Sequence, residues 1–156
     1  EDWHNFQNFA EWAYKKPQAW FMEGESIWEL DKDSLVEGNK VYRADRCTFL
    51  PPELNTFFSD STWSKDTPRG VNYIKPASDN SKEGWIARCN MNGERKYLGY
   101  FNDPMEAFYK YKEVKESYAE VLAEKYKGRI EDDVYLRLRN FKVYPYPPTE
   151  DSEVKS

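Results

Sequence analysis

The long amphipathic segment at residues 103–128 constrains the fold of this chain more than any other feature. Its apolar residues recur at a period close to 3.6 residues, so they line one face of a single helix. They are Ala107, Phe108, Tyr111, Val114, Tyr118, Val121, Leu122 and Tyr126. Asp103, Pro104 and Glu106 form a capping box with a proline in the first turn. Gly128 lies where a glycine commonly ends a helix, so we predict one long helix whose apolar stripe packs on another surface.

A small antiparallel sheet is predicted immediately before this helix. Three strands are expected, at residues 70–74, 85–91 and 96–101. The last two are joined through Asn92-Gly93, a dipeptide that is typical of two-residue hairpin turns. The prediction is therefore a three-stranded sheet that packs on the long helix.

The two faces of this sheet follow from alternation, because successive side chains of a strand point to opposite sides. Ile86, Leu98 and Tyr100 are the apolar residues expected to meet the helix. Strict alternation also places Arg88 on the face of Ile86, and arginine is rarely buried. We therefore expect either a β-bulge or a position of Arg88 near the end of its strand.

The front half of the chain is predicted to hold shorter elements. They are a helix at residues 3–14, a short strand around residues 28–30, an extended stretch at residues 47–50 and a helix from Pro51-Pro52 to Phe57. A later helix is predicted at residues 131–141. The predicted boundaries are 1–58 for a first module, 59–67 for a polar linker, 68–128 for the sheet and long helix, 129–146 for a C-terminal helix and extension, and 147–156 for a disordered tail.

Charge is unevenly distributed along the chain. The net charge of −5 argues against indiscriminate binding to nucleic acid. Residues 68–101 nevertheless carry six Lys/Arg against three Asp/Glu and form the only basic segment. Residues 1–67 carry seven Lys/Arg against thirteen Asp/Glu. The basic segment coincides with the predicted sheet, which makes a sheet face the candidate surface for an anionic partner.

No cofactor, metal site or membrane span is predicted. Cys47 and Cys89 are isolated and His4 is the single histidine, so no familiar zinc spacing is present. We expect two reduced, partly buried thiols, with a disulfide between them as the alternative. None of the 7 glycines forms a phosphate-binding fingerprint. No long apolar run and no secretory signal pattern are present, so a cytoplasmic protein is expected, and the first residue, Glu1, suggests a missing upstream segment.

Four short motifs follow one another through the predicted sheet and helix: Arg69-Gly70-Val71, Trp85-x-Ala87, Tyr97-Leu98-Gly99-x-Phe101, and Glu106-Ala107 followed by Tyr111. In this order, over residues 68–118, they resemble the DNA-binding domain of the plant ethylene-response-factor (Apetala-two) type. The resemblance implies a sheet that lies in the major groove of double-stranded DNA, where arginine contacts guanine through two hydrogen bonds.

The resemblance also implies which residues bind DNA. They are Arg69, Tyr73, Lys75, Trp85, Arg88, Arg95, Lys96 and Tyr97. Lys75 and Lys96 are expected to contact phosphates rather than bases. The alternative is an ordinary solvated basic face on a small sheet.

A second set of motifs occupies the front half: Trp3-His4-x-Phe6-x-x-Phe9-Ala10-x-Trp12, Leu30-Asp31-Lys32-Asp33, Gly38-Asn39-Lys40-x-Tyr42 and Cys47-x-Phe49-x-Pro51. They resemble a phage-encoded group related to HNH endonucleases, which implies a ββα module over residues 1–58. HNH chemistry needs a histidine base just before the second motif, where this chain has Trp28-Glu29. The comparison with that family therefore implies a degenerate nuclease site, without a catalytic residue or a metal.

Three carboxylates lie close together in this front half. Glu29, Asp31 and Asp33 share one face of the predicted strand. Oxygen ligands of this kind suit Mg²⁺ or Ca²⁺. A solvated acidic face is the more common role of such a pattern, and it is the one we expect.

Together these observations predict an α+β protein of a phage or mobile element that binds double-stranded DNA through its sheet. A single module with few phosphate contacts is expected to bind weakly, with a shallow dependence on salt. Two alternatives stay open: an active homing-type HNH endonuclease completed by an upstream segment, and a phage protein that inhibits a host defence enzyme. The acidic front half favours the second alternative, because an acidic surface binds basic sites meant for nucleic acid.

Overall fold

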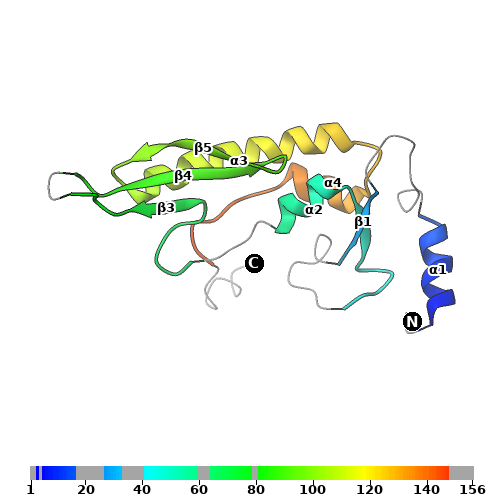
Figure 1. The fold of residues 1–156 in the computed structure, drawn as a ribbon. Coiled ribbons are helices and arrows are strands. Elements are labelled where there is room, and N and C mark those ends of the chain that lie inside the picture. The colour runs from blue at the N-terminus through cyan, green and yellow to red at the C-terminus, as the bar shows by residue number, and fades with distance from the viewer. Residues whose placement is uncertain are drawn as a thin grey trace, which may run out of the picture. The chain divides into compact units, whose positions relative to one another are not determined.

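The computed structural model describes residues 3, 5–16, 27–32, 41–59, 64–78 and 81–147. Within them the fold is α+β, as predicted, with four helices and two small antiparallel sheets (Figure 1). The chain divides into two compact units, Glu1–Asp60 with Glu120–Asn140 and Ser61–Ala119 with Phe141–Ser156. None of the described helices is long and apolar enough to cross a membrane.

The first unit combines a two-stranded sheet with short helices. Its elements are α1 (Phe6–Tyr14), β1 (Glu29–Asp31), β2 (Thr48–Leu50), α2 (Pro52–Ser59), α4 (Asp132–Arg139) and the last residues of α3 (Pro104–Tyr126). β1 and β2 pair antiparallel, with Leu30 opposite Phe49. The predicted order of strand, strand and helix is confirmed by β1, β2 and α2. The first helix begins at Phe6 because Asn5 caps it, its side-chain oxygen accepting a hydrogen bond from Gln7 N–H at 2.9 Å.

Apolar residues from β2, α2, α4 and the end of α3 form the buried interior of this first unit. They are Cys47, Leu50, Leu54, Phe57, Leu122, Ala123, Tyr126, Ile130, Val134 and Leu138. Glu53 of α2 ties the end of α3 to this interior, because its carboxylate accepts hydrogen bonds from Tyr126 Oη at 2.8 Å and from Lys125 Nζ. Burial and the hydrogen bond to Glu53 together raise the pKa of Tyr126.

The second unit is built on a three-stranded antiparallel sheet. Its strands are β3 (Val71–Ile74), β4 (Gly84–Met91) and β5 (Glu94–Phe101), in the spatial order β3-β4-β5. Asn92 and Gly93 have φ values of 52° and 77°, which identifies the predicted two-residue hairpin as a type I′ turn. The backbone N–H of Asn92 donates to Tyr118 Oη at 3.0 Å, so α3 holds the tip of this hairpin.

The first part of α3 covers one face of this sheet, as predicted (Figure 1). Asp103 caps the helix, its Oδ1 accepting hydrogen bonds from the N–H groups of Met105 (2.8 Å) and Glu106 (3.1 Å). The core between sheet and helix consists of Val71, Ala87, Cys89, Ala107, Phe108, Tyr111 and Val143. A Cβ on Gly70, which has a φ of 75°, would lie only 2.2 Å from the Tyr111 ring. This glycine therefore sets how closely β3 approaches α3.

A β-bulge in β5 determines which residues face the helix. Ala87 of β4 pairs with Gly99 of β5. The next residue of β4, Arg88, pairs with Tyr97, so Leu98 is left as the extra residue of the bulge. Leu98 packs against the core, as predicted. The bulge leaves the alternation of β4 unbroken, so Arg88 stays on the face of Ile86 and the bulge expected to separate these two residues is not found.

The predicted contact of Ile86 and Tyr100 with the helix is wrong. These two residues lie opposite each other in the β4–β5 pairing and share the face of Arg88. Ala87 and Cys89 are the β4 residues that are buried against α3. Only small side chains alternate with Ile86 at these buried positions, because α3 lies close to the strand.

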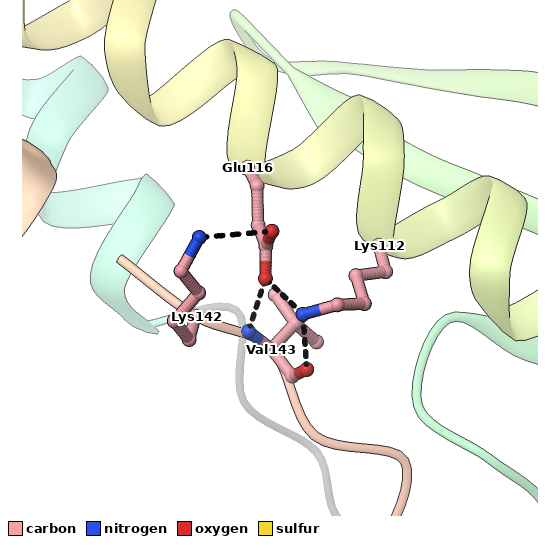
Figure 2. A network of polar contacts seen from close by, with 4 residues as sticks. All are labelled: Lys112, Glu116, Lys142 and Val143. Carbon is pink, nitrogen blue, oxygen red and sulfur yellow. Dashed lines mark hydrogen bonds and ion pairs between the residues drawn. The ribbon is translucent and has the colours of Figure 1, made fainter. Parts of the chain in front are cut away.

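The C-terminal segment 141–147 is part of the second unit and is held to α3 (Figure 2). Val143 is buried in the core, and its backbone N–H donates to Glu116 Oε1 at 2.9 Å. Lys112 Nζ donates both to Glu116 and to the carbonyl oxygen of Val143, the latter at 3.2 Å. Lys142 Nζ lies 3.5 Å from Glu116 Oε2. One carboxylate therefore fixes a short piece of chain against the helix.

The same segment also reaches the start of the sheet. Pro145 contributes a carbonyl oxygen that accepts a hydrogen bond from Arg69 N–H at 2.9 Å. The second unit thus includes Phe141–Ser156 and leaves out the end of α3. This division differs from the predicted boundaries, which closed the sheet-and-helix domain at residue 128.

Candidate nucleic-acid interface

The side of the three-stranded sheet opposite α3 carries arginines, amides and tyrosines, and we call it the outward face. Residues paired across antiparallel strands share a face, so the register defines its members. From one end of the sheet to the other they are Ile74, then the row of Asn72, Ile86 and Tyr100, then the pair of Arg88 and Tyr97, and last the pair of Asn90 and Arg95. The face therefore combines positive charge with hydrogen-bonding groups and exposed rings on one regular surface.

Two arginines supply the positive charge of the outward face. Arg95 is exposed, and its Nη2 donates to Asn72 Oδ1 at 3.2 Å, across the width of the sheet. Arg88, at the centre of the face, is half-buried. In the part of the chain that the structure describes, no carboxylate lies within 4.0 Å of either guanidinium. Both charges are thus available to an anionic ligand.

Lysines elsewhere in the same unit differ in this respect. On α3, Lys110 lies 2.9 Å from Glu113, and Lys112 pairs with Glu116. In the C-terminal segment, Lys142 pairs with Glu116 as well. The contrast matters because an ion pair within the protein must be weakened before the cation binds a phosphate.

Tyr97 and Tyr100 supply the rings of the outward face. Tyr97 is 61% exposed and lies beside Arg88 in the pairing of β4 with β5. Tyr100 is 45% exposed, and its hydroxyl donates to the carbonyl oxygen of Glu83 at 3.0 Å. Its ring lies over Gly84, where an added Cβ would be 2.0 Å from the ring. Gly84 therefore makes room for a ring that lies flat on the sheet.

Trp85 and Tyr73, two of the predicted DNA-binding residues, lie on the opposite side of the sheet. Trp85 packs against the core cluster and contacts Tyr73, with ring centroids 5.0 Å apart. Tyr73 Oη donates to Glu83 at 2.8 Å, and this hydrogen bond raises the pKa of Tyr73. The structure thus separates these two aromatic residues from Arg88 and Arg95, which the sequence had grouped with them.

The other predicted residues lie at the borders of the sheet. Lys96 is exposed on the edge strand β5, on the side of Cys89, with which it pairs. Arg69 and Lys75 flank β3, Arg69 being half-buried and Lys75 exposed. Of the eight predicted positions, the structure brings Arg88, Arg95 and Tyr97 together on the outward face.

Four residues of the outward face were missed by sequence reasoning. They are Asn72, Ile86, Asn90 and Tyr100. The alternation of Ala87, Cys89 and Met91 was the signal that could have found them, because three small or apolar residues at alternate positions mark the buried side of β4.

The first unit holds no site of comparable definition among its described residues. The carboxylate of Glu29 accepts a hydrogen bond from Asn55 Nδ2, and Asp33 and His4 lie outside the described residues. Within the described ranges no group of three or more His, Cys, Asp or Glu residues could hold a metal ion. Cys47 is free and buried, and this burial raises the pKa of its thiol.

Comparison of the chain with protein-family models, with curated proteins and with solved structures finds no match. The outward face itself therefore carries the functional argument.

Proposed function

We propose that this protein binds double-stranded DNA by placing the outward face of its three-stranded sheet in the major groove. The observation that carries the proposal is the pair of guanidinium groups, Arg88 and Arg95, on a regular face where no described carboxylate neutralises them. The order of motifs in the sheet and helix, which resembles the ethylene-response-factor type, supports the same conclusion.

The geometry of the outward face suits this role. The major groove is about 12 Å wide and admits β-strands, and an arginine contacts the O6 and N7 of guanine through two hydrogen bonds. Arg95 is partly oriented by Asn72 before DNA binds, which lowers the entropy lost on binding. Lys75 and Lys96 at the borders of the sheet are suited to contact the phosphates on either side.

The proposed setting is the cytoplasm of a bacterial cell that carries a phage or mobile element. In this proposal the first unit of the protein retains the strand, strand and helix order of an HNH-type module but has no nuclease activity. This part of the proposal rests on the motif resemblance and on Trp28-Glu29 in the place of a catalytic histidine.

Fluorescence anisotropy with a labelled random-sequence duplex tests the proposal. Binding should be measurable at about 50 mM salt and weaken several-fold at about 200 mM, with a shallow slope that matches few phosphate contacts. Arg88→Ala and Arg95→Ala should each weaken binding by about 1–3 kcal/mol on a preferred sequence. Lys110→Ala is the matched control, because it also removes one positive charge but lies on α3, in an ion pair.

Two results would count against the proposal. Equal losses for Lys110→Ala and for the arginine variants would mean that only overall charge matters. Absence of binding at low salt would refute DNA binding and favour the alternative in which the acidic residues 1–67 bind a basic host protein.

A further inference from the structure

An apolar patch lies next to the arginines on the outward face. It consists of Ile74, Ile86 and Tyr100, whose positions are set by the pairs Ile74–Gly84 and Ile86–Tyr100. Ile74 and Ile86 are half-buried and Tyr100 is exposed. The face is therefore not uniformly polar: one end carries the guanidinium groups and the other end carries a small apolar surface.

Contacts with the sheet hold the residues of the patch in defined positions. The hydroxyl of Tyr100 donates to the carbonyl oxygen of Glu83, and the ring lies directly over Gly84. Ile86 is β-branched and lies in the central strand, which restricts its rotamers. A fixed apolar surface of this kind can distinguish a ligand that presents a methyl group from one that does not.

The spacing between patch and arginine matches the repeat of DNA. Ile86 and Arg88 are two residues apart on the same face of β4, which corresponds to roughly 6.7 Å along the strand. Successive bases of one DNA strand are about 3.4 Å apart along the helix axis. If β4 follows the groove, Ile86 lies about two base pairs from the base that Arg88 contacts.

We infer that Ile86 and Tyr100 contact the C5-methyl group of a thymine, about two base pairs from a guanine contacted by Arg88. In the major groove of unmodified DNA, thymine is the one base that presents a methyl group, and apolar side chains recognise it. This inference rests on the proposed function and deepens it. It adds two residues that determine specificity and predicts that preferred sites combine guanine with thymine at a fixed short distance.

Replacement of single thymines by deoxyuridine tests this assignment, because the change removes one methyl group and keeps every base-pairing contact. Preferred sites are first selected from a random duplex pool, and each thymine of a selected site is then replaced in turn. Wild-type protein should lose about fourfold in affinity at one or two thymines, the value expected for one buried methyl group. Arg88→Ala should lose the preference for guanine at the position two base pairs from that thymine.

Ile86→Ala provides the protein side of the test. This variant should discriminate less than the wild type between the thymine and deoxyuridine versions of the site, because only the contact of Tyr100 remains, while its salt dependence stays that of the wild type. Val121→Ala is the matched control, since Val121 is also β-branched, is 60% exposed and lies on α3. It should retain the full preference for thymine.

The outcomes separate the inference from the proposed function. Selected sites that bind equally with thymine or deoxyuridine at every position would overturn the thymine contact and leave DNA binding intact. Absence of binding to the random pool at low salt would overturn both. The deoxyuridine comparison uses wild-type protein, so it decides the question even if Ile86→Ala folds poorly.

Discussion

Replacement of Glu116 by glutamine tests how the C-terminal segment is held to the second unit. The carboxylate accepts hydrogen bonds from Lys112 Nζ and from Val143 N–H, and lies 3.5 Å from Lys142 Nζ (Figure 2). Its side chain is only 19% exposed. Glutamine has nearly the same shape and retains one acceptor oxygen, so Glu116→Gln removes the charge and little else.

The expected loss follows from these contacts. A hydrogen bond to a charged group contributes about 1.5–3 kcal/mol and a neutral one about 0.5–1.5 kcal/mol, so the bond from Val143 N–H, which becomes neutral, loses about 1 kcal/mol. The bond from Lys112 keeps its charged donor but loses its attraction to the carboxylate charge, a loss of similar size at this half-buried position. The pair with Lys142, whose side chain is 62% exposed, adds little. We expect the free energy of unfolding to fall by about 1–3 kcal/mol and Val143 N–H to exchange faster with solvent.

The structure also determines how the stability difference between wild type and Glu116→Gln depends on pH. Partial burial raises the pKa of Glu116, but the hydrogen bonds from Lys112 and Val143 and the charges of Lys112 and Lys142 outweigh it, so the pKa lies below its ordinary value of 4.5. A carboxyl group with a lowered pKa in the folded state stabilises the protein above its unfolded pKa and loses this effect as the pH falls through the folded pKa. The difference between wild type and Glu116→Gln should be complete at neutral pH and shrink below pH 4.5.

Urea unfolding followed by tryptophan fluorescence, with hydrogen exchange at Val143 as a local measurement, gives both quantities. Glu113→Gln is the control, because Glu113 also pairs with a lysine of α3 but is 65% exposed. Its effect should stay within about 0.5 kcal/mol. The reasoning is refuted if the two variants are equally stable, or if the deficit of Glu116→Gln is unchanged at acid pH.

Three further outcomes are expected. Gly70→Ala should lower the free energy of unfolding by roughly 2–5 kcal/mol in a urea titration, because its φ of 75° and the Tyr111 ring both oppose a Cβ. Asn72→Ala should weaken binding of a preferred duplex in the anisotropy assay by about 0.5–1.5 kcal/mol, less than Arg95→Ala, because it removes only the bond that orients Arg95. Cys47 should react with a disulfide reagent far more slowly in the folded protein than in urea, because burial raises its pKa and restricts access; an equal rate would contradict its placement.

Local signals were enough to predict the sheet and its helix. Asp103 caps α3 as its sequence neighbourhood indicated, and Asn92-Gly93 forms the expected hairpin turn. Both features depend on the conformational preferences of a few adjacent residues, which tertiary packing does not override here.

The facing of residues in β5 was harder to predict, because it depends on a bulge that no local pattern locates. Leu98 is the extra residue in β5, and a shift of one residue moves every later side chain to the other side. Alternation without the bulge placed Tyr100 on the buried side with Leu98, Ile86 was assigned there because it is apolar, and Trp85 was grouped with the arginines by the family resemblance alone. In the structure all three assignments are reversed.

The role of the C-terminal segment could not be read from the chain either. Val143 is a single valine between Lys142 and Tyr144, without periodicity to mark it as buried. Its burial depends on Glu116, which is far away in sequence and lies in a helix that contains several other glutamates. Long-range hydrogen bonds of this kind are visible only once the fold is known.

The late position of Val143 has a consequence for the order of events during synthesis. The core of the second unit gains its last residue only after residues 120–140, which belong to the first unit, have been added. At about 5–20 residues per second, synthesis of residues 120–147 takes roughly 1.5–6 s. Throughout this interval the nascent sheet and helix lack the C-terminal segment that Glu116 and Lys112 bind in the folded protein.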